Sequence, residues 1–297
     1  MLGATTSHVE ECPDLGPECA SSPPPVPYRH HVKLFLTETN FDASYGLTPW
    51  LAIDARFGFR VVDITPTYFE LDGAPKRVDD DIHHHDETLV GLTDPWLVAR
   101  LGAASGKLVT TSRLGFTLPL GNTVEDPYAL GARGLSHEHT QLGTGTFVPI
   151  VGLGLAWIDP RYELSLSAVA LFSLYENDKG FRAPSRSFVS SRMTLPLLES
   201  TWRPYATFEL AHEGRERWHG VDGAESFVRN DLLVGAGLGW RFAPPWEAQL
   251  GLRVRAASLG NGATFEYPGI VMFGLATSFG GPGEPPPHHH SHEHLDD

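Results

Sequence analysis

The sequence predicts an all-β protein, an antiparallel transmembrane β-barrel of about 12 strands with short periplasmic turns and long extracellular loops. The first observation is side-chain alternation, since residues 50–62 place apolar side chains on one face of a strand and polar ones on the other. The second is that connections between such segments alternate between short and long, as in outer-membrane barrels. In residues 50–62 the apolar face carries Leu51, Ile53, Ala55, Phe57, Phe59 and Val61, and the other carries Asp54, Arg56, Gly58 and Arg60.

Eleven segments of the chain alternate clearly enough to be taken as strands. They are residues 31–41, 50–62, 92–101, 108–120, 147–157, 162–175, 189–197, 202–210, 228–242, 246–256 and 269–279. A closed single-chain barrel with both ends in the periplasm needs an even number of strands. The missing strand would run upward before His31, and residues 1–30 hold too many prolines to supply it. We therefore expect a sequence that is incomplete at its N-terminus, or an unusual open or odd barrel.

Composition divides the chain into three regions. Residues 1–30 are expected to be a disordered, proline-rich leader with two cysteines, residues 31–280 the barrel, and residues 281–297 a disordered tail rich in proline and histidine. Cys12 and Cys19 can form a local disulfide in an oxidising periplasm or remain thiols. The first residues lack the basic start and apolar core of the secretory signal that an outer-membrane barrel requires. Either the signal has been removed, or the start is wrong, or the barrel prediction is wrong.

Charge and hydropathy exclude two other classes. No run approaches the roughly 18 apolar residues of a membrane-spanning helix, and the mean hydropathy is −0.16. A helical membrane protein is therefore excluded, whereas a barrel, which keeps half of its side chains in a polar lumen, is not. The net charge of −14 argues against nucleic acid as a partner.

The competing fold is a large soluble β-sandwich or lipocalin-like barrel, which alternates in the same way. Tryptophan placement favours the membrane barrel, because an aromatic girdle marks the membrane interface near strand ends. The tryptophans that lie near strand ends beside short turns are Trp50, Trp157, Trp202, Trp240 and Trp246. We therefore expect the protein in the bacterial outer membrane.

Three short motifs carry a family resemblance. Residues 91–102 read GLTDPWLVARLG, residues 114–121 read LGFTLPLG, and residues 141–157 read QLGTGTFVPIVGLGLAW. The chain resembles, over about residues 31–280, the outer-membrane transporter family named for the meta-pathway of phenol degradation. In that family a Gly-Leu-x-Asp strand start, a Leu-Pro-x-Gly strand end and a Gly-Thr-Gly strand start recur in this order. The resemblance implies a barrel of about a dozen strands with a transport role, and it does not imply that this chain handles phenol.

The expected topology gives the side of the membrane on which each connection lies, and the expected location gives the partners. Short turns lie in the periplasm and long loops outside, so the loops at 63–88, 121–143, 176–186 and 211–226 become extracellular. The expected partners are outer-membrane lipid and lipopolysaccharide, the barrel-assembly machinery, and a small-molecule or ion solute. A final strand that ends at Phe279 resembles the signal that the assembly machinery reads, although this chain continues to residue 297.

Arginines outnumber acids on the polar faces of the strands, although the whole chain is acidic. One hypothesis is an anion-preferring pore, because rings of arginine set selectivity in anion channels. The other is structural, since ladders of arginine and carboxylate can fill a narrow lumen. The predicted lumen-lining residues are Asp54, Arg56, Arg60, Arg100, Arg113, Glu163, Arg192, Arg203, Glu209, Arg229, Asp231, Arg241, Glu247, Arg253 and Arg255, with Asp94 on the same faces.

Histidines form the second group of interest, because neutral imidazole binds Zn²⁺, Ni²⁺ and Cu(II). A flexible tail with several imidazoles can capture such metals weakly and multivalently, or it is simply a solvated low-complexity end. The candidate metal ligands are His288, His289, His290, His292 and His294 in the tail and His83, His84 and His85 in the first long loop. No cofactor is expected to be required.

We expect a channel or transporter for small solutes, with a link to divalent metals through the tail, and no enzyme. One alternative is a rim-site hydrolase, for which Asp86, His137, Glu138, His139 and His212 are available on the outer side. No spacing among them selects a nucleophile and a base. The other alternative is a structural barrel with a plugged lumen and no transport.

Overall fold

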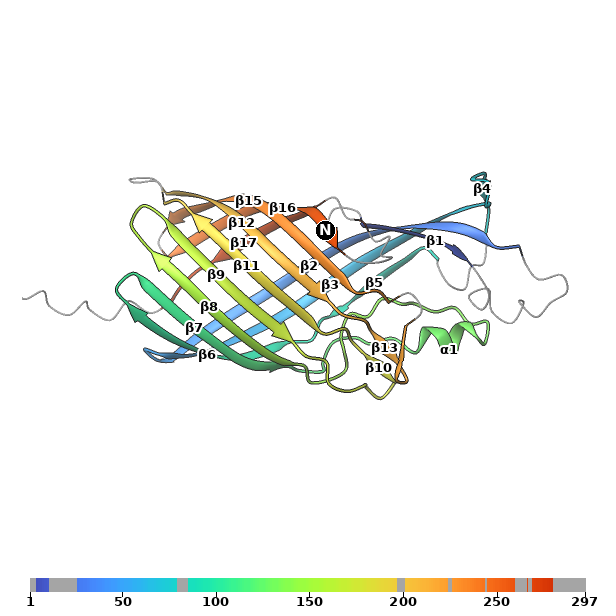
Figure 1. The fold of residues 1–297 in the computed structure, drawn as a ribbon, viewed down its shortest axis with the longest axis horizontal. Coiled ribbons are helices and arrows are strands. Elements are labelled where there is room, and N and C mark those ends of the chain that lie inside the picture. The colour runs from blue at the N-terminus through green and yellow to red at the C-terminus, as the bar shows by residue number, and fades with distance from the viewer. Residues whose placement is uncertain are drawn as a thin grey trace, which may run out of the picture.

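The computed structural model describes residues 4–10, 26–78, 85–196, 201–223, 226–243, 245–259, 266 and 269–279. In these residues nearly all regular structure is antiparallel β, and the main sheet is 14-stranded. Its strands follow the order β1-β2-β3-β6-β7-β8-β9-β11-β12-β15-β16-β17, and β4 and β5 pair with β3 beside this path. Figure 1 shows the strands tilted and curled into a barrel wall. The predicted fold class is confirmed.

Each of the eleven predicted segments overlaps a strand or strands of the main sheet, in the predicted order, and further short strands lie between them. Their bounds are β1 Ala4–Glu10, β2 Tyr28–Thr48, β3 Leu51–Phe69, β4 Pro75–Lys76, β5 Glu87–Leu92, β6 Trp96–Ser105, β7 Leu108–Thr117, β8 Pro149–Ile158, β9 Glu163–Leu171, β10 Phe181–Arg182, β11 Arg186–Thr194, β12 Trp202–Glu213, β13 Arg217–Trp218, β14 Val221–Asp222, β15 Arg229–Ala243, β16 Trp246–Leu259 and β17 Ile270–Ala276. One short helix, α1, spans Pro127–Gly131. Among the described residues no helix is long and apolar enough to cross a membrane.

The structure corrects the expected leader at residues 4–10. These residues form β1, which pairs antiparallel with the outer end of β2 from Ala4↔Leu34 to Glu10↔Tyr28. This is an upward strand before His31, which the proline content was expected to forbid, but it pairs only with residues 28–34 of β2 and does not complete the membrane-spanning barrel. The prolines begin only at Pro13, so the seven residues of β1 can donate to a backbone ladder. Cys12 and Cys19 lie outside the described residues, and so does the tail from residue 280.

The β2–β3 hairpin is longer than expected, and its polarity inverts along its length. Residues 44–48, expected in a connection, extend β2, and residues 63–69, expected in a long loop, extend β3. On β3 the outward side chains are apolar up to Val61, whereas Asp63, Thr65 and Thr67 continue the same face. On the inner face the order is reversed, since Val62 and Ile64 are buried above the charged Arg60. Residues 51–61 therefore match the roughly 9–11 residues of a membrane-spanning strand, and the hairpin continues beyond it.

The predicted strand 92–101 is in fact two strands separated by a break. β5 pairs with the C-terminal half of β3, from Phe59↔Leu92 to Ile64↔Glu87. β6 pairs with the N-terminal half of β3, from Leu51↔Leu101 to Arg56↔Trp96. Between them Thr93, Asp94 and Pro95 leave the ladder. Proline lacks the N–H that a ladder requires, which ends the pairing at this point. The break places Asp94 off the wall of the barrel.

The outer face of the barrel is apolar and carries an aromatic belt. Trp50, Trp157, Trp202, Trp240 and Trp246 are all exposed near the tight turns. Trp202 and Trp240 stack across β12 and β15 with ring centroids 5.5 Å apart. A soluble barrel would bury this face, so its exposure on strand after strand fits a lipid-facing surface.

The opposite end of the barrel bears the long connections. Figure 1 shows α1, β10, β13 and β4 at one end of the molecule and the tight turns of β6–β7 and β8–β9 at the other. We call the connections 118–148, 172–185 and 214–228 the cap. Strands β10, β13 and β14 form a small three-stranded sheet within the cap.

Candidate channel lumen and its cap

Charged side chains of the strands face the concave side of the sheet. Most guanidinium groups pair with carboxylates of other strands or of the same strand, so the wall is a ladder of opposite charges. Glu38 and Asp42 of β2 belong to the ladder and were missed, although the alternation of polar residues continues past residue 41. The pairs are Arg56–Asp42 (2.6 Å), Arg60–Glu38 (2.6 Å), Arg100–Asp54 (2.8 Å), Arg229–Asp231 (3.0 Å), Arg241–Glu247 (3.0 Å), Arg253–Glu209 (3.1 Å), Arg255–Asp231 (3.8 Å) and Arg203–Glu163.

Two predicted lumen arginines differ from the rest. Within the part of the chain that the structure describes, Arg113 and Arg192 make no ion pair with a carboxylate. Arg113 lies opposite Arg100 in the β6–β7 ladder, so two guanidinium groups share the neighbourhood of one carboxylate, Asp54. These two positions therefore leave positive charge that the ladder does not neutralise.

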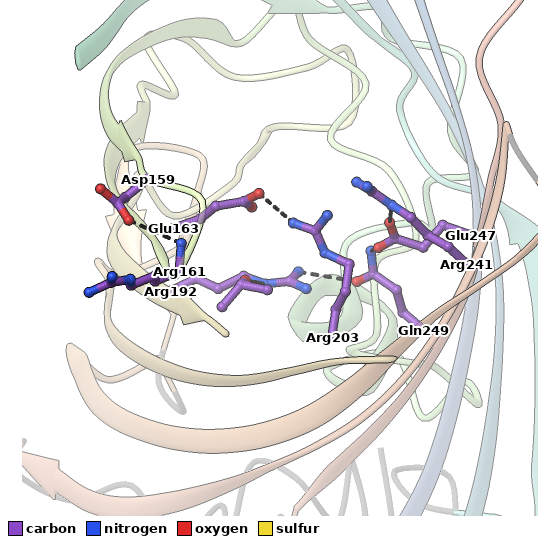
Figure 2. A network of polar contacts seen from close by, with 9 residues as sticks. Asp159, Arg161, Glu163, Arg192, Arg203, Arg241, Glu247 and Gln249 are labelled. Carbon is purple, nitrogen blue, oxygen red and sulfur yellow. Dashed lines mark hydrogen bonds and ion pairs between the residues drawn. The ribbon is translucent and has the colours of Figure 1, made fainter. Parts of the chain in front are cut away.

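Arg192 is held by neutral groups that converge from three strands. Its Nη1 donates to Gln249 Oε1 (3.1 Å), its Nε donates to Thr194 Oγ1 (3.2 Å), and its guanidinium lies 3.8 Å from the ring centroid of Tyr205. Gln249 Nε2 in turn donates to Glu247 Oε1 (2.9 Å). Figure 2 shows this network reaching from Arg192 on β11 to Gln249 and Glu247 on β16. The arrangement fixes a cation in the lumen without cancelling its charge.

Glycines of β15 and β16 make room for the ring that supports Arg192. A Cβ at Gly237 or at Gly251 would overlap the Tyr205 side chain. These two glycines lie opposite each other in the β15–β16 ladder, so the ring lies over a surface of bare backbone. Tyr205 is 8% exposed and its hydroxyl donates to Leu250 O (3.4 Å). The position of Arg192 therefore depends on the absence of side chains on a neighbouring pair of strands.

A cavity of about 330 Å³ opens beside these residues. That volume lies at the lower end of the about 300–1,000 Å³ of small-molecule sites. β9, β11, β12, β16 and β17 all contribute to it. Its polar lining includes Ser165, Ser190, Arg192, Tyr205, Thr207, Glu209, Gln249 and Arg253.

Asp94 ties the three sequence motifs together at the outer end of the lumen. Its carboxylate accepts hydrogen bonds from Gly121 N (2.9 Å), Thr144 N (2.7 Å) and Thr144 Oγ1 (2.6 Å), and the residue is 8% exposed. Gly121 and Gly143 are packed backbone to backbone, because a Cβ on either would lie 2.6–2.7 Å from the other. The Gly-Leu-x-Asp, Leu-Pro-x-Gly and Gly-Thr-Gly motifs therefore contact one another in one cluster. This cluster anchors the connection between β7 and β8.

The anchored connection packs onto the inner wall of the barrel. Leu142 is buried against Val32 of β2 and Val62 and Ile64 of β3, the inner residues of the hairpin above its membrane-spanning part. Farther along the wall Leu34 of β2 packs against the buried Leu233 of β15. At these positions the outer part of the lumen is filled by apolar side chains of the chain itself.

Other contacts join the cap segments to one another. Phe181 and Trp218 are buried with ring centroids 4.9 Å apart. His219 lies 3.2 Å from the Asp126 carboxylate, and Lys179 donates to Thr123 O (3.0 Å). In the β13–β14 turn, hydrogen bonds from Arg217 and Arg215 hold the pKa of the Asp222 carboxyl below its usual range. The cap is therefore a packed structure at this end of the barrel.

The histidines predicted as metal ligands fall into two groups. His83, His84 and the tail histidines lie outside the described residues, so their metal binding stays a prediction. His85 lies just before β5, and its Nε2 is 3.2 Å from Glu87 Oε2 and 3.4 Å from Glu138 Oε1. Burial, with the hydrogen bond and negative charge of Glu87, raises the pKa of the Glu138 carboxyl to about 9.

The residues considered for a rim hydrolase occupy different settings. His137 Nδ1 lies 3.0 Å from Leu135 O, and its ring is 5.3 Å from that of His139. His212 Nδ1 instead lies 2.7 Å from Asn230 Oδ1 on the β12–β15 ladder. Ser136 Oγ is 3.5 Å from His85 Nδ1, longer than the roughly 2.6–3.2 Å that joins a nucleophile to its base.

Together these features define a protein with the outer-membrane β-barrel fold. Over 92% of each chain the structure is similar to the COG4313 outer membrane channel of Pseudomonas putida F1, with 12% identity and a TM-score of 0.53. It also matches OmpT, an outer membrane protein of Vibrio cholerae, over 92% of this chain and 95% of that one, with 10% identity and a TM-score of 0.34. The first similarity supports the fold alone, and the second is too weak to support a conclusion. No protein-family model matches the chain, and no curated protein does.

Proposed function

We propose that the protein is a channel of the bacterial outer membrane that passes small polar solutes and prefers anions. The observation that carries the proposal is the cavity on the concave face, lined by polar and apolar side chains, beside a guanidinium that no carboxylate neutralises. The similar structure from Pseudomonas putida F1 is named a channel, which supports the proposal. The transporter family that the three motifs resemble agrees with it and leaves the solute unassigned.

Charge pairing decides where selectivity arises. Eight predicted lumen arginines lie in ion pairs, and a paired charge presents little net field to a passing ion. Arg113 and Arg192 keep an excess of positive charge on the wall. We therefore expect weak anion preference that depends on two side chains, rather than the strong preference that ten unpaired arginines would produce.

Planar-bilayer recordings under a KCl gradient test the proposal. The wild-type reversal potential should indicate Cl⁻ passing faster than K⁺, and the Arg113→Ala, Arg192→Ala double variant should lose that preference. Arg192→Lys keeps the charge and should keep the selectivity, and Arg161→Ala, in a periplasmic turn, should change nothing. A cation-selective wild type would refute the anion preference. A folded barrel that conducts nothing would favour the plugged structural barrel instead.

A further inference from the structure

We propose that His85, Glu87 and Glu138 form a binding site for a divalent transition metal, of which Zn²⁺ is the representative, at the extracellular mouth of the barrel. One ligand atom from each residue lies within 4.8 Å of the other two. Glu87 belongs to β5, His85 lies just before β5, and Glu138 belongs to the cap.

The spacing of these atoms fits the metal. Zinc bonds of about 2.0–2.2 Å in a tetrahedron place neighbouring ligand atoms about 3.3 Å apart. His85 Nε2 lies 3.2 Å from Glu87 Oε2 and 3.4 Å from Glu138 Oε1. Small adjustments of side-chain rotamers would bring the carboxylates to the same separation. Three protein ligands would leave one position of the tetrahedron for water or a solute.

Poorly satisfied acceptors supply a second argument. Apart from the contacts with His85 Nε2 and the contact between the two carboxyl groups, the buried atoms Glu87 Oε2 and Glu138 Oε1 have no donor among the described residues. Burial of a charge is usually compensated by a counter-charge or a metal. Ser136 Oγ lies 3.5 Å from His85 Nδ1, on the far side of the ring. A weak contact there orients the imidazole so that Nε2 faces the carboxylates.

Ligand chemistry favours a transition metal over calcium or magnesium. Ca²⁺ and Mg²⁺ prefer sites built only from oxygen atoms, with six or more ligands. An imidazole together with two carboxylates is typical of zinc and its neighbours in the first transition row. The three ligands are all held by the fold, so the site is separate from the His-rich tail.

The position of the site gives the metal a structural effect. Glu87 is the first residue of β5 and His85 lies just before it, whereas Glu138 belongs to the same connection as Leu142 and Thr144, which packs inside the mouth. A metal bound by all three residues would join that connection to the wall of the barrel. Binding does not depend on the proposed channel function, but a lower conductance in the presence of metal rests on it.

Metal titration of the full-length chain in detergent tests the site. The five tail histidines are replaced by asparagine in every sample, which removes competing imidazoles while keeping the chain length. Zn²⁺ affinity is measured by competition with a chromophoric chelator. His85→Ala, Glu87→Gln and Glu138→Gln should each weaken the tightest site at least tenfold, whereas Glu125→Gln, an exposed acid of the same connection, should not.

A second measurement separates site loss from misfolding. Co²⁺ bound to the parent chain should show the intense visible absorption of a tetrahedral complex, and the three ligand variants should lose it while keeping heat-modifiable migration in gels. Equal Zn²⁺ affinity of parent and ligand variants, or no binding by the folded parent, would overturn the proposal. If the barrel binds metal but never conducts, the proposed metal site stands and only the proposed channel function is rejected.

Discussion

Replacing Asp94 with alanine should release the connection between β7 and β8 from the mouth of the barrel. The Asp94 carboxylate links the break in the wall to the Gly121 and Thr144 backbones. Beside it, Asn122 and Leu92 are joined by two further hydrogen bonds, which Asp94→Ala leaves in place. Alanine removes three acceptor contacts at once and leaves two backbone N–H groups in a site that is almost closed to water. The barrel strands themselves lose no ladder hydrogen bond.

The magnitude follows from those three contacts. A hydrogen bond to a charged group contributes about 1.5–3 kcal/mol, and a buried donor without a partner costs about 1–3 kcal/mol. Because the freed amides regain water once the connection opens, we expect the free energy of local opening to fall by about 3–6 kcal/mol. At about 1.4 kcal/mol for each factor of ten, the open population rises by about 10²–10⁴.

Hydrogen–deuterium exchange with mass spectrometry measures this opening. Peptides that contain Gly121 and Thr144 should exchange faster in Asp94→Ala by the stated factor, while peptides from β8 and β15 stay protected. Asp94→Asn keeps one acceptor oxygen but turns an NH₂ toward the other amide, so its effect should be intermediate. Asp72→Ala, which removes a similar bond in the exposed turn after β3, is the control. Unchanged exchange in Asp94→Ala would show that the cluster of the three motifs does not hold the connection.

Three further predictions concern packing and pH. Gly237→Ala should destabilise the folded barrel by about 1–3 kcal/mol in urea unfolding, because the methyl group would displace the Tyr205 ring; Gly46→Ala, with nothing within 4 Å, should not. Trp218→Ala should make the cap sensitive to protease, at a local cost of about 3–5 kcal/mol, without changing gel migration of the barrel; equal protease resistance would contradict the packing argument. The ion pairs of Asp222 with Arg217 and Arg215 should persist at pH 4 and disappear only below it. The reason is that the pKa of Asp222 is lowered in the folded state, so the contribution of the pairs is lost as pH falls through that folded pKa. NMR titration of the Asp222 carboxyl checks this, and a midpoint at or above 4 would contradict it.

The strands could be predicted because each one has to satisfy lipid on one face and a polar lumen on the other. That constraint ends where the membrane ends, which is why the outer parts of β2 and β3 were not predicted: above Val61 the polar side chains face outward and the apolar ones inward, the reverse of the pattern below. β1 was missed for a different reason. The proline count of residues 1–30 hid a proline-free segment at residues 4–10.

The site was less predictable, because it depends on partners from distant loops. Alternation places Arg192 and Arg253 on one face of their strands, but it says nothing of which carboxylate each will reach. It therefore predicts a cationic wall where the structure has mostly paired charges. Asp94 was counted among the lumen charges, and only the break between β5 and β6 shows that it faces the cap. Nor does sequence distance indicate that Glu138 lies beside His85.

The β2–β3 hairpin is longer than a membrane-spanning hairpin requires. The 21 residues of β2 extend about 70 Å at about 3.4 Å per residue, or about 50 Å along the membrane normal at a tilt near 45°. An apolar band of about 25 Å covers only half of that height. The turn at residues 70–74, where Gly73 has φ 90°, stands at the far end (Figure 1). An epitope inserted there should be reached by antibodies on intact cells, and a fluorophore at Asp72 would report on the orientation of single barrels.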